Sequence, residues 1–334
     1  MQTRRVGRTG LKVSPICLGT MTFGYQCDEP TSWAIMDRAA DGGVDFLDTA
    51  DVYPLGGGAE RVGRTEEIVG RWLRGKRDRF VLATKCHGAT GPGPNERGGS
   101  RLHILKAVED SLRRLQTDYI DLYQLHGFDA ETPLDETLRA LDDLVRSGKV
   151  RYIGCSNYRA WQLATALWTS DKLGLARFDC DQPRYNILYR DIEADLLPLC
   201  RAQGVGIIAY NPLAGGFLTG KYDKGEQPRE GTRFTLGTAA RMYQARYWRE
   251  AQFDAVDKLK RFFSERDQSL TQVAIAWVLQ RPGITSAIVG ASRPEQLDES
   301  LSATDLTLDA EAEERLGDVW YNLPRETDPA IAMR

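Results

Sequence analysis

Short apolar runs alternate with segments of helical periodicity along most of this chain. Runs of this length, bounded by turn residues, predict strands. The predicted strands are Ile16–Leu18, Phe46–Leu47, Phe80–Ala83, Ile120–Leu125, Tyr152–Cys155, Phe178–Asp181, Val205–Tyr210 and Ala287–Val289. Between them, apolar residues recur every three or four positions, which is typical of helices that pack one face against a sheet. The clearest case is Arg101–Leu115, where Ser100 is expected to be the N-cap.

This order of elements predicts the fold class. A helix between two strands returns the chain to the same edge of the sheet, so the strands pair in parallel. Eight such units fit an α/β protein with a closed (β/α)8 TIM barrel and long βα loops at its C-terminal face. Ahead of the barrel, Arg4–Val6 and Leu11–Val13 flank the turn residues Gly7–Gly10 and predict an N-terminal β-hairpin.

The domain organisation is expected to be simple. Because no change of composition marks a linker, we expect a single barrel domain over residues 1–334, with a flexible tail at 323–334. Two irregular stretches, Cys86–Gly99 and Thr219–Trp248, are expected to be long loops, and loops of this length are usually functional.

Two other phosphate-binding architectures fit less well. An open doubly wound sheet that binds a dinucleotide needs G-x-G-x-x-G after its first strand, and no predicted strand is followed by that motif. Gly215–Lys221 is similar to a P-loop, but Tyr222 stands where that motif needs Ser or Thr.

The composition excludes several classes of partner. With 42% hydrophobic residues, 27% charged residues and a net charge of −3, the chain is typical of a soluble globular protein and is not expected to bind nucleic acid or an anionic membrane. No apolar run reaches the roughly eighteen residues of a membrane span, and the N-terminus lacks the apolar stretch of a signal peptide. Six scattered cysteines without a C-x-x-C pair favour reduced thiols in the cytoplasm. With three histidines and no thiol cluster, no metal site is expected.

Four polar residues follow successive predicted strands. Asp48 ends the second strand, and Tyr53 lies five residues further along. Lys85 follows the third strand, and His126 follows the fourth. In such a barrel the reacting groups lie where strands end and βα loops begin. Each residue alone has an ordinary explanation as a cap, a rim aromatic or a solvated charge, but all four together predict a catalytic site.

This group of side chains suits proton transfer to a carbonyl oxygen. A phenol has a pKa of about 10, which is too high for proton exchange at neutral pH without help. We expect the Lys85 ammonium to lower the pKa of Tyr53, and Asp48 to keep Lys85 charged and in place. The His126 imidazole can donate to a carbonyl oxygen. Such a site stabilises the charge that develops on oxygen when hydride arrives at carbon.

The segments around these residues resemble the aldo-keto reductase superfamily. FLDTADVYPLGGGAERVGR, VLATKC, LRRLQTDYIDLYQLHG, VRYIGCSNY and NPLAGGFLTGKY are similar to its signature segments, in the same order. The resemblance extends from about Gly7 to about Leu308. Within the superfamily, the chain looks closest to bacterial general-stress type reductases and to the β subunits of voltage-gated potassium channels, which share segments like ERGGSRLHI and GASRPEQL.

The resemblance implies an NADPH-dependent oxidoreductase that reduces an aldehyde or ketone to an alcohol. Tyr53 would be the proton donor, Lys85 and Asp48 its tuning pair, and His126 the residue that orients the substrate. The cofactor, NADPH or NADP+, would lie extended across the barrel top.

The same resemblance implies a set of cofactor contacts. The carboxamide would be held beside the ends of two strands, and Tyr210 would stack on the nicotinamide face. The implied contacts are Thr20, Met21, Gln26, Asp48, Ser156, Asn157, Gln182, Tyr210, Asn211, Pro212, Leu213, Gly215, Lys221, Arg233, Gly290, Ser292, Arg293, Gln296, Glu299 and Ser300.

The adenosine end also has a physical basis in the sequence. GASRPEQLDES places Ser292 and Arg293 at the start of a predicted helix, with Pro294 in its first turn. Free N–H groups there attract an anion, and arginine adds charge-assisted bonds, which favours the 2′-phosphate of NADP. An ordinary capped helix is the alternative. The family often has Asn where this chain has Ser300, which puts the adenine contact in doubt.

An apolar and aromatic set is expected to line the substrate pocket. Its members are Met21, Phe23, Tyr53, Phe128 and Trp248, which favours neutral, partly apolar carbonyl compounds. The arginine-rich segment 219–248 is expected to clamp the cofactor, shape this pocket or contact another subunit, and the sequence does not choose among these roles.

Two other functions remain open at this point. One is an NADPH-binding regulatory or redox-sensing subunit with slow turnover, like the channel β subunits, although His126 favours an enzyme. The other is an NAD-linked sugar dehydrogenase of the same fold, and this alternative depends on Arg293. The physiological substrate, the preferred direction and the existence of a homo-oligomer are not decided by the sequence.

Overall fold

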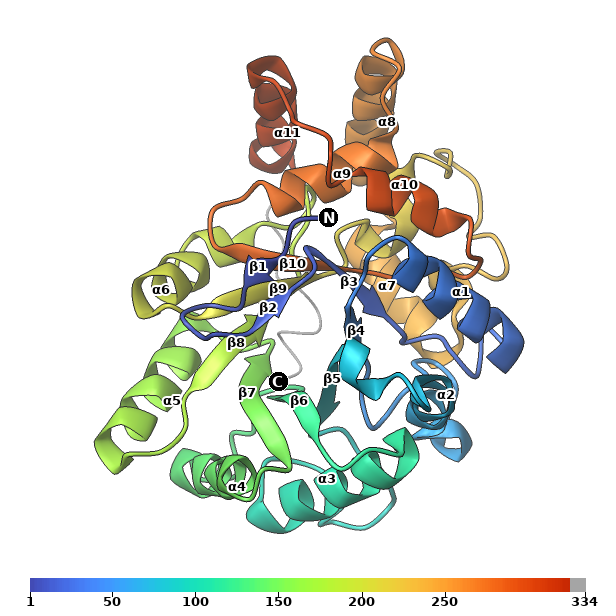
Figure 1. Ribbon diagram of the computed structural model, residues 1–334. Helices are drawn as coiled ribbons and strands as arrows, with labels where there is room; N and C mark the ends of the chain where they lie inside the picture. Colours follow the sequence, from blue (N-terminus) through green and yellow to red (C-terminus); the bar gives the residue numbers. More distant parts are fainter. Residues whose placement is uncertain (325–334) are drawn as a thin grey trace.

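A closed barrel of eight parallel strands forms the centre of the computed structural model, which describes residues 1–324 (Figure 1). The strands are β3 (Ile16–Gly19), β4 (Phe46–Asp48), β5 (Val81–Cys86), β6 (Ile120–Leu125), β7 (Val150–Ser156), β8 (Phe178–Gln182), β9 (Gly206–Tyr210) and β10 (Ile284–Val289). Each pairs in parallel with the next along the chain, and β10 pairs with β3 to close the barrel. The predicted (β/α)8 barrel is confirmed.

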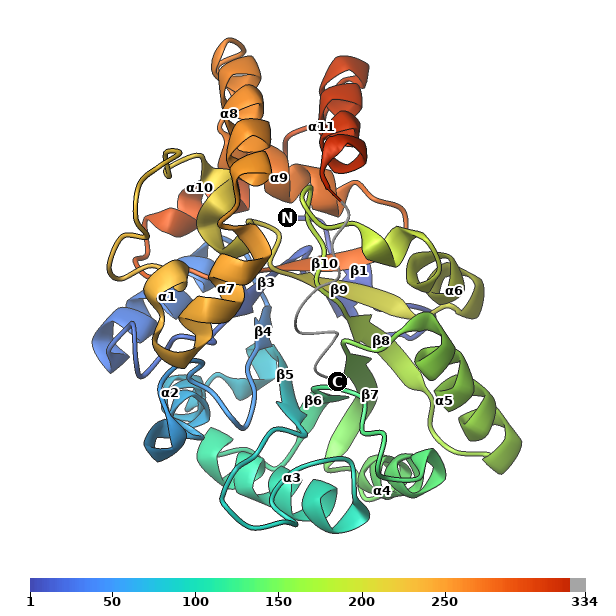
Figure 2. The ribbon, with the colours of Figure 1, turned by 180° about the vertical axis from the view of Figure 1, so that it is seen from behind.

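Helices surround the barrel, and Figure 2 shows the arrangement from the opposite side. The connections up to β9 contain α1 (Glu29–Asp41), α2 (Arg64–Leu73), α3 (Arg101–Leu115), α4 (Leu134–Arg146), α5 (Ala160–Leu173) and α6 (Leu196–Gln203). The connection from β9 to β10 contains α7 (Ala240–Tyr247), α8 (Glu250–Ser264) and α9 (Leu270–Leu279), and β10 is followed by α10 (Gln296–Ser302) and α11 (Ala310–Asn322). Both views show α8 and α11 projecting from one side of the barrel.

Helix α3 shows how the local pattern sets an element. The Ser100 side chain accepts a hydrogen bond from His103 N at 3.3 Å, which satisfies one of the free donors of the first turn. The helix ends at Gln116, whose φ of 55° leaves the helical region. The buried positions of α3 recur at helical spacing and are His103, Ile104, Ala107, Val108, Ser111, Leu112 and Leu115. Both predicted ends of this helix are confirmed.

The predicted N-terminal hairpin is present and short. Its strands are β1 (Arg4–Arg5) and β2 (Lys12–Val13), paired antiparallel. Arg8 N donates to Gly204 O at 2.8 Å, just before β9 begins, so the hairpin lies against the N-terminal end of the barrel. The opposite end is therefore the one left for a functional site.

The barrel interior changes from apolar to polar along the strands. Alternate residues of a strand share a face, and one apolar cluster joins Phe46, Ala83, Leu122, Cys180 and Ile208 with the hairpin residues Val6 and Val13. Four of these strands carry a polar residue two positions further along, on the same face. These residues are Asp48, Lys85, Gln124 and Gln182. The apolar layer that fills one end of the barrel is thus followed directly by a layer of polar groups at the other end.

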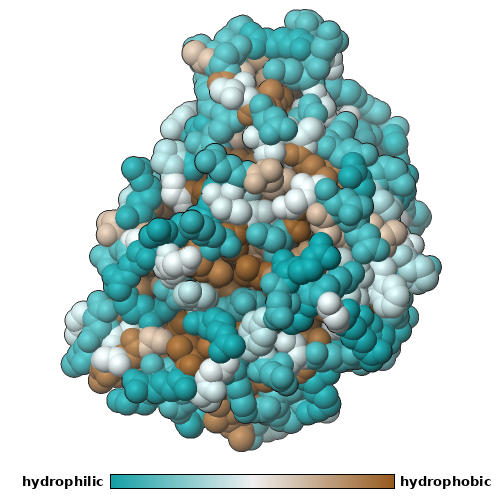
Figure 3. Space-filling model, viewed as in Figure 1, coloured by the Kyte–Doolittle hydropathy of each residue, from teal (hydrophilic) through white to brown (hydrophobic). Residues whose placement is uncertain are grey.

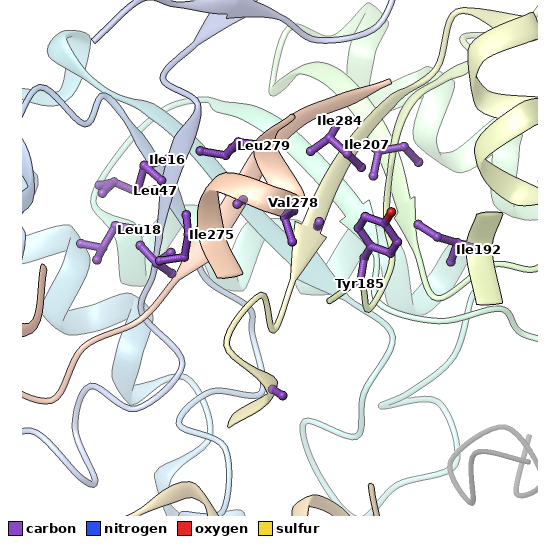
Figure 4. Close-up of a cluster of buried hydrophobic side chains, with 14 of the residues drawn as sticks. Ile16, Leu18, Leu47, Tyr185, Ile192, Ile207, Ile275, Val278, Leu279 and Ile284 are labelled. Atoms are coloured by element: carbon purple, nitrogen blue, oxygen red, sulfur yellow. The ribbon is translucent and has the colours of Figure 1, made fainter. Parts of the chain in front are cut away.

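A second, larger core lies between the barrel and its helices. Figure 4 shows part of it, where Ile275, Val278 and Leu279 of α9 lie beside strand residues such as Ile16 and Leu18. Strands buried on both faces appear in the sequence as continuous apolar runs, which is why the runs could be found. The face of the molecule in Figure 3 is mostly hydrophilic, with hydrophobic groups lying between polar ones.

The structure differs from the predictions at several boundaries. Five strands extend beyond their predicted ends, to Gly19, Asp48, Cys86, Ser156 and Gln182. In four of them, polar side chains near the end of the strand hide it from a hydropathy pattern. The stretch 219–248 is not irregular throughout, since it contains α7. The tail predicted at 323–334 lies outside the described residues except for Leu323, which is buried, and Pro324.

Candidate active site

Three neighbouring strands bring the predicted catalytic residues to the C-terminal end of the barrel. Asp48 is the last residue of β4, and Lys85 lies near the end of β5. His126 directly follows β6, where its backbone N–H donates to Cys86 O at 2.8 Å. Tyr53 is in the loop after β4, and its ring and the His126 ring lie 5.7 Å apart, edge to face. The structure therefore brings together all four residues that the sequence singled out.

A buried ion pair is the centre of this group. Lys85 Nζ donates to Asp48 Oδ1 at 2.5 Å and to Thr49 O at 2.8 Å. Lys85 is 0% exposed and Asp48 is 3% exposed, so water stabilises neither charge. A buried pair of this kind is tolerated only when further hydrogen bonds satisfy its remaining atoms.

Two glutamine side chains supply those hydrogen bonds. Gln182 Nε2 donates to Asp48 Oδ2 at 2.8 Å, and Gln124 Nε2 donates to the same oxygen at 3.3 Å. One carboxylate oxygen is therefore engaged by the ammonium and the other by two amides. The Asp48 side chain is held at both oxygens.

The Tyr53 phenol is kept in its protonated form. Burial raises the pKa of Tyr53 well above its usual value, Asp48 raises it further, and Arg233 lowers it in part. This differs from the expectation that Lys85 would lower the pKa. Lys85 Nζ lies 5.3 Å from the centre of the Tyr53 ring. Its charge is offset by the Asp48 carboxylate, whose Oδ1 lies only 2.5 Å from Nζ.

This arrangement can deliver a proton to a partly enclosed oxygen. An O–H with a high pKa ionises only when the acceptor is more basic still, and an alkoxide is such an acceptor. The Asp48 carboxylate is far less basic than a phenolate and is engaged with Lys85, so it does not take the phenol proton. At neutral pH the phenol therefore carries a proton that it can donate.

The residues expected to hold a carboxamide are hydrogen bonded to one another. Asn157 Nδ2 donates to His126 O at 3.1 Å and to Ser156 Oγ at 2.9 Å, while Asn157 Oδ1 accepts from Tyr210 OH at 2.8 Å. Ser156 Oγ donates to Gln182 O at 2.7 Å. These residues form one connected polar group beside His126.

A tight turn follows β9 where the pyrophosphate contacts were expected. Gly215 N donates to Asn211 Oδ1 at 2.8 Å, and Gly216 N donates to Leu213 O at 2.8 Å. Pro212 lies between these two acceptor residues. The side chain of Asn211 thus folds the turn, so its role in the structure is to shape the backbone that lies beside the barrel end.

A cluster of positive charge lies close to this turn. Its members are Lys221, Arg229, Arg233 and Arg293. Partial desolvation lowers the pKa of Lys221, and the charges of the three arginines lower it further. Arg233 Nη1 is buried and has no hydrogen-bond partner among the described residues. An anion relieves the repulsion within such a cluster, and a buried guanidinium needs an acceptor, so these residues fit the phosphates of a dinucleotide.

The turn around Arg293 differs from its prediction. Helix α10 begins at Gln296, three residues later than expected, and Gln296 Oε1 accepts from Ser292 N at 2.8 Å. Ser300 is buried, and its hydroxyl donates to Gln296 O at 3.4 Å, whereas Arg293 and Glu299 are exposed. Arg293 therefore lies in a turn before the helix. An anion at this position would be bound by the guanidinium charge of Arg293 and not by a helix N-terminus.

The segment 219–248 lies against the loops that follow β3 and β4. Gln26 Nε2 donates to Gly231 O in this segment. A Cβ on Gly237 would lie 2.2 Å from Gly56 O in the β4 loop, so only glycine permits this approach. On the β3 side, Thr20 Oγ1 donates to Asp48 O at 2.9 Å, which joins that loop to the ion pair. The segment thus crosses the end of the barrel that carries the polar residues.

The residues expected in the substrate pocket have different surroundings. Met21 is partly buried, but Phe23 is 0% exposed and its side chain has no surface for a substrate in this conformation. Phe128 packs edge to face against Tyr158, with ring centres 5.3 Å apart. Trp248 packs among the aromatic residues Tyr222, Phe234 and Phe253. Phe23 is therefore left out of the proposed pocket.

Sequence reasoning missed Gln124, although a signal was present. Gln124 is a polar residue inside the apolar run of β6, and it lies two positions before His126. Residues two apart on a strand face the same side, so the period alone places Gln124 beside the four predicted residues. Thr49, whose carbonyl accepts from Lys85, gave no such signal because a backbone atom makes the contact.

Within residues 1–324, no helix is long and apolar enough to cross a membrane. The same part of the chain holds no group of three or more His, Cys, Asp or Glu residues in a metal-binding arrangement.

Comparison with known proteins gives consistent matches over the whole barrel. The model of the aldo/keto reductase family matches residues 15–320. The uncharacterized oxidoreductase YrpG of Bacillus subtilis is 40% identical, over 99% of this chain and the whole of that protein. A probable voltage-gated potassium channel subunit beta of Arabidopsis thaliana is 38% identical over 92% of each chain. L-glyceraldehyde 3-phosphate reductase of Escherichia coli is 35% identical over 91% of this chain and 87% of that one.

Proposed function

The chain belongs to the aldo/keto reductase family, and we propose that it reduces an aldehyde or ketone to an alcohol, with NADPH as cofactor and Tyr53 as proton donor. The observation that carries this proposal is the buried group at the barrel end, in which a protonated phenol lies beside a fully engaged Lys85–Asp48 pair.

The residues of the chain divide the work of the reaction. When bound, NADPH would supply the hydride for the carbonyl carbon and would itself be oxidised to NADP+. Tyr53 donates its O–H proton to the carbonyl oxygen as negative charge develops there. The Lys85 ammonium stabilises the phenolate that remains, at 5.3 Å from the ring centre. His126, edge to face with Tyr53, orients the carbonyl from the other side.

Cofactor binding is supported by the polar groups around the barrel end. Both protons of Gln182 Nε2 are engaged, by Asp48 Oδ2 and by Gln124 Oε1. We therefore assign Gln182 Oε1, an acceptor, to the carboxamide N–H of the nicotinamide. The cluster of Lys221, Arg229, Arg233 and Arg293 is assigned to the phosphates.

The choice between NADPH and NADH is expected to depend on Arg293. A charge-assisted hydrogen bond is worth about 1.5–3 kcal/mol, so Arg293→Ala should weaken NADPH binding roughly ten- to a hundred-fold, because the 2′-phosphate loses its partner. NADH binding should be nearly unchanged. Fluorescence titration of both cofactors measures this, with Arg113→Ala, an exposed arginine on α3, as the control. Equal losses for the two cofactors would show that Arg293 does not bind the phosphate.

The proposed activity is tested with purified protein and a panel of carbonyl compounds. The panel contains a small aliphatic aldehyde, an aromatic aldehyde, a ketone and a phosphorylated triose, and NADPH absorbance reports turnover. We expect turnover with neutral, partly apolar aldehydes, because Met21, Phe128 and Trp248 carry no charge. Faster turnover of the triose phosphate would move the substrate class toward that of the similar Escherichia coli reductase.

A regulatory subunit is the second candidate, and the similarity to the plant potassium channel subunit favours it. Such a protein would bind NADPH tightly and turn over slowly with every carbonyl. Tight NADPH binding without turnover across the panel would select this function over the enzyme.

A further inference from the structure

Gln124 is a fully buried amide in the wall of the barrel, next to the ion pair. It is paired in register with Lys85 on β5 and with Gly154 on β7. Its exposed fraction is 0%, so its polar atoms can be satisfied only by the barrel interior. Nothing in the sequence motifs of the site assigned it a role.

The hydrogen bonds of Gln124 define its orientation. Nε2 donates to Asp48 Oδ2 at 3.3 Å, and a carboxylate can only accept, so the amide nitrogen must face Asp48. Oε1 accepts from Gln182 Nε2 at 3.3 Å and from Cys180 Sγ at 3.7 Å. The two glutamines and Asp48 thus form a closed triangle of hydrogen bonds.

The neighbouring backbone is arranged to admit this side chain. Gly154 stands between Gln124 and Cys180 in the register of the sheet. A Cβ on Gly154 would lie 2.5 Å from Cys180 Sγ and 3.3 Å from Gln124 Cγ. Any larger residue would therefore push both side chains off their partners. The space for the amide is built into β7.

The triangle has a mechanical consequence for the charged residues. Asp48 Oδ1 receives Lys85, and the two amides on Oδ2 prevent the carboxylate from rotating about its side-chain bond. If one amide is lost, the carboxylate gains freedom to turn, and the direction of Lys85 Nζ relative to Tyr53 changes with it. Small changes of this kind are costly in a preorganised site.

We propose that Gln124 is a positioning residue for the reduction: it holds Asp48, and through Asp48 it aims Lys85 at Tyr53. This inference rests on the proposed function, because its effect is measured on that reaction. Because Gln124 is 0% exposed, it is not a group that contacts the substrate, and it acts through the side chains that it holds, chiefly the Asp48 carboxylate.

The test uses Gln124→Met, which keeps the length of the side chain and removes its donor. We expect kcat to fall about ten-fold, the loss typical of a hydrogen bond to a charged group, while the Kd of NADPH stays close to that of the wild type. The Tm should fall only modestly, because Gln182 still donates to Asp48 Oδ2. Gln182→Met should lower both kcat and NADPH affinity, because Gln182 is also assigned to the carboxamide of the nicotinamide. Gln252→Met on α8, also a buried glutamine, is the matched control and should leave both unchanged.

A double-mutant cycle separates positioning from simple structural support. If Gln124 acts through Asp48, Gln124→Met should have little further effect on kcat in an Asp48→Asn background. A full additional loss there, or a parallel fall of kcat, NADPH affinity and Tm, would overturn the inference. An unchanged kcat in Gln124→Met, measured beside an active wild type, would also overturn the inference. A wild type that reduces no carbonyl would instead reject the proposed function, and the inference with it.

Discussion

Tyr53→Phe is expected to reduce kcat for carbonyl reduction by about 10²–10⁴, and somewhat more if its hydrogen bond to the developing oxyanion adds to the loss. The phenol is the proton donor, and burial together with Asp48 keeps its pKa well above the usual range, so the group is protonated at neutral pH. Phenylalanine keeps the ring and its packing against His126 but removes the proton. Stopped-flow or steady-state NADPH absorbance measures the change.

Two further measurements make this result specific. NADPH affinity and Tm should be unchanged in Tyr53→Phe, because no phosphate or carboxamide contact is assigned to the phenol. Tyr243→Phe is the matched control: Tyr243 is buried and near enough to Tyr53 to raise its pKa, but it has no assigned role as an acid. Turnover of Tyr53→Phe within ten-fold of the wild type would remove Tyr53 from the proposed role.

Lys85→Met is expected to reduce both stability and turnover. The substitution leaves the Asp48 carboxylate buried without its cation, and breaking a buried pair from one side typically costs about 3–5 kcal/mol in the free energy of unfolding. Turnover should also fall, because the phenolate of Tyr53 loses its nearest ammonium. Denaturant unfolding and NADPH oxidation measure the two effects separately.

A double variant identifies the source of the lost stability. Lys85→Met with Asp48→Asn removes both charges, so it should be more stable than Lys85→Met alone, while turnover stays low. If the stability that the double variant loses relative to the wild type equals the sum of the losses of the two single variants, the two residues are not energetically coupled. The observed distance of 2.5 Å between Lys85 Nζ and Asp48 Oδ1 would then have no thermodynamic meaning.

The sequence predicted the end of a strand correctly where the strand ends in a buried apolar residue. It predicted the end too early where polar residues of the site lie at the end of the strand. The run Ile120–Leu125 matches β6 at both ends, and five of its six residues are buried. By contrast, β4 and β8 each continue to one more residue, Asp48 and Gln182. A polar side chain that is satisfied inside the barrel looks, in a hydropathy pattern, like the start of a loop.

The region between β9 and β10 was predicted less well for a different reason. Helix α7 spans only Ala240–Tyr247, which is about two turns, and such a short segment has little periodicity to detect. Its place in the structure depends on contacts with aromatic residues of the same segment, such as Phe234 with Tyr243. Tertiary packing, not local preference, makes this helix.

The sequence by itself determined the order of strands and helices, and therefore the barrel and the strand ends that carry Asp48, Lys85 and His126. Periodicity and chain order are local properties, and a parallel barrel converts them directly into neighbours in space. Only the tertiary structure decided that Gln182 and Gln124 meet on one oxygen of Asp48, across 134 and 76 positions of the chain. It also decided the direction of the Tyr53 pKa, because burial and the distances between charges set that direction, and neither is written in residue spacing.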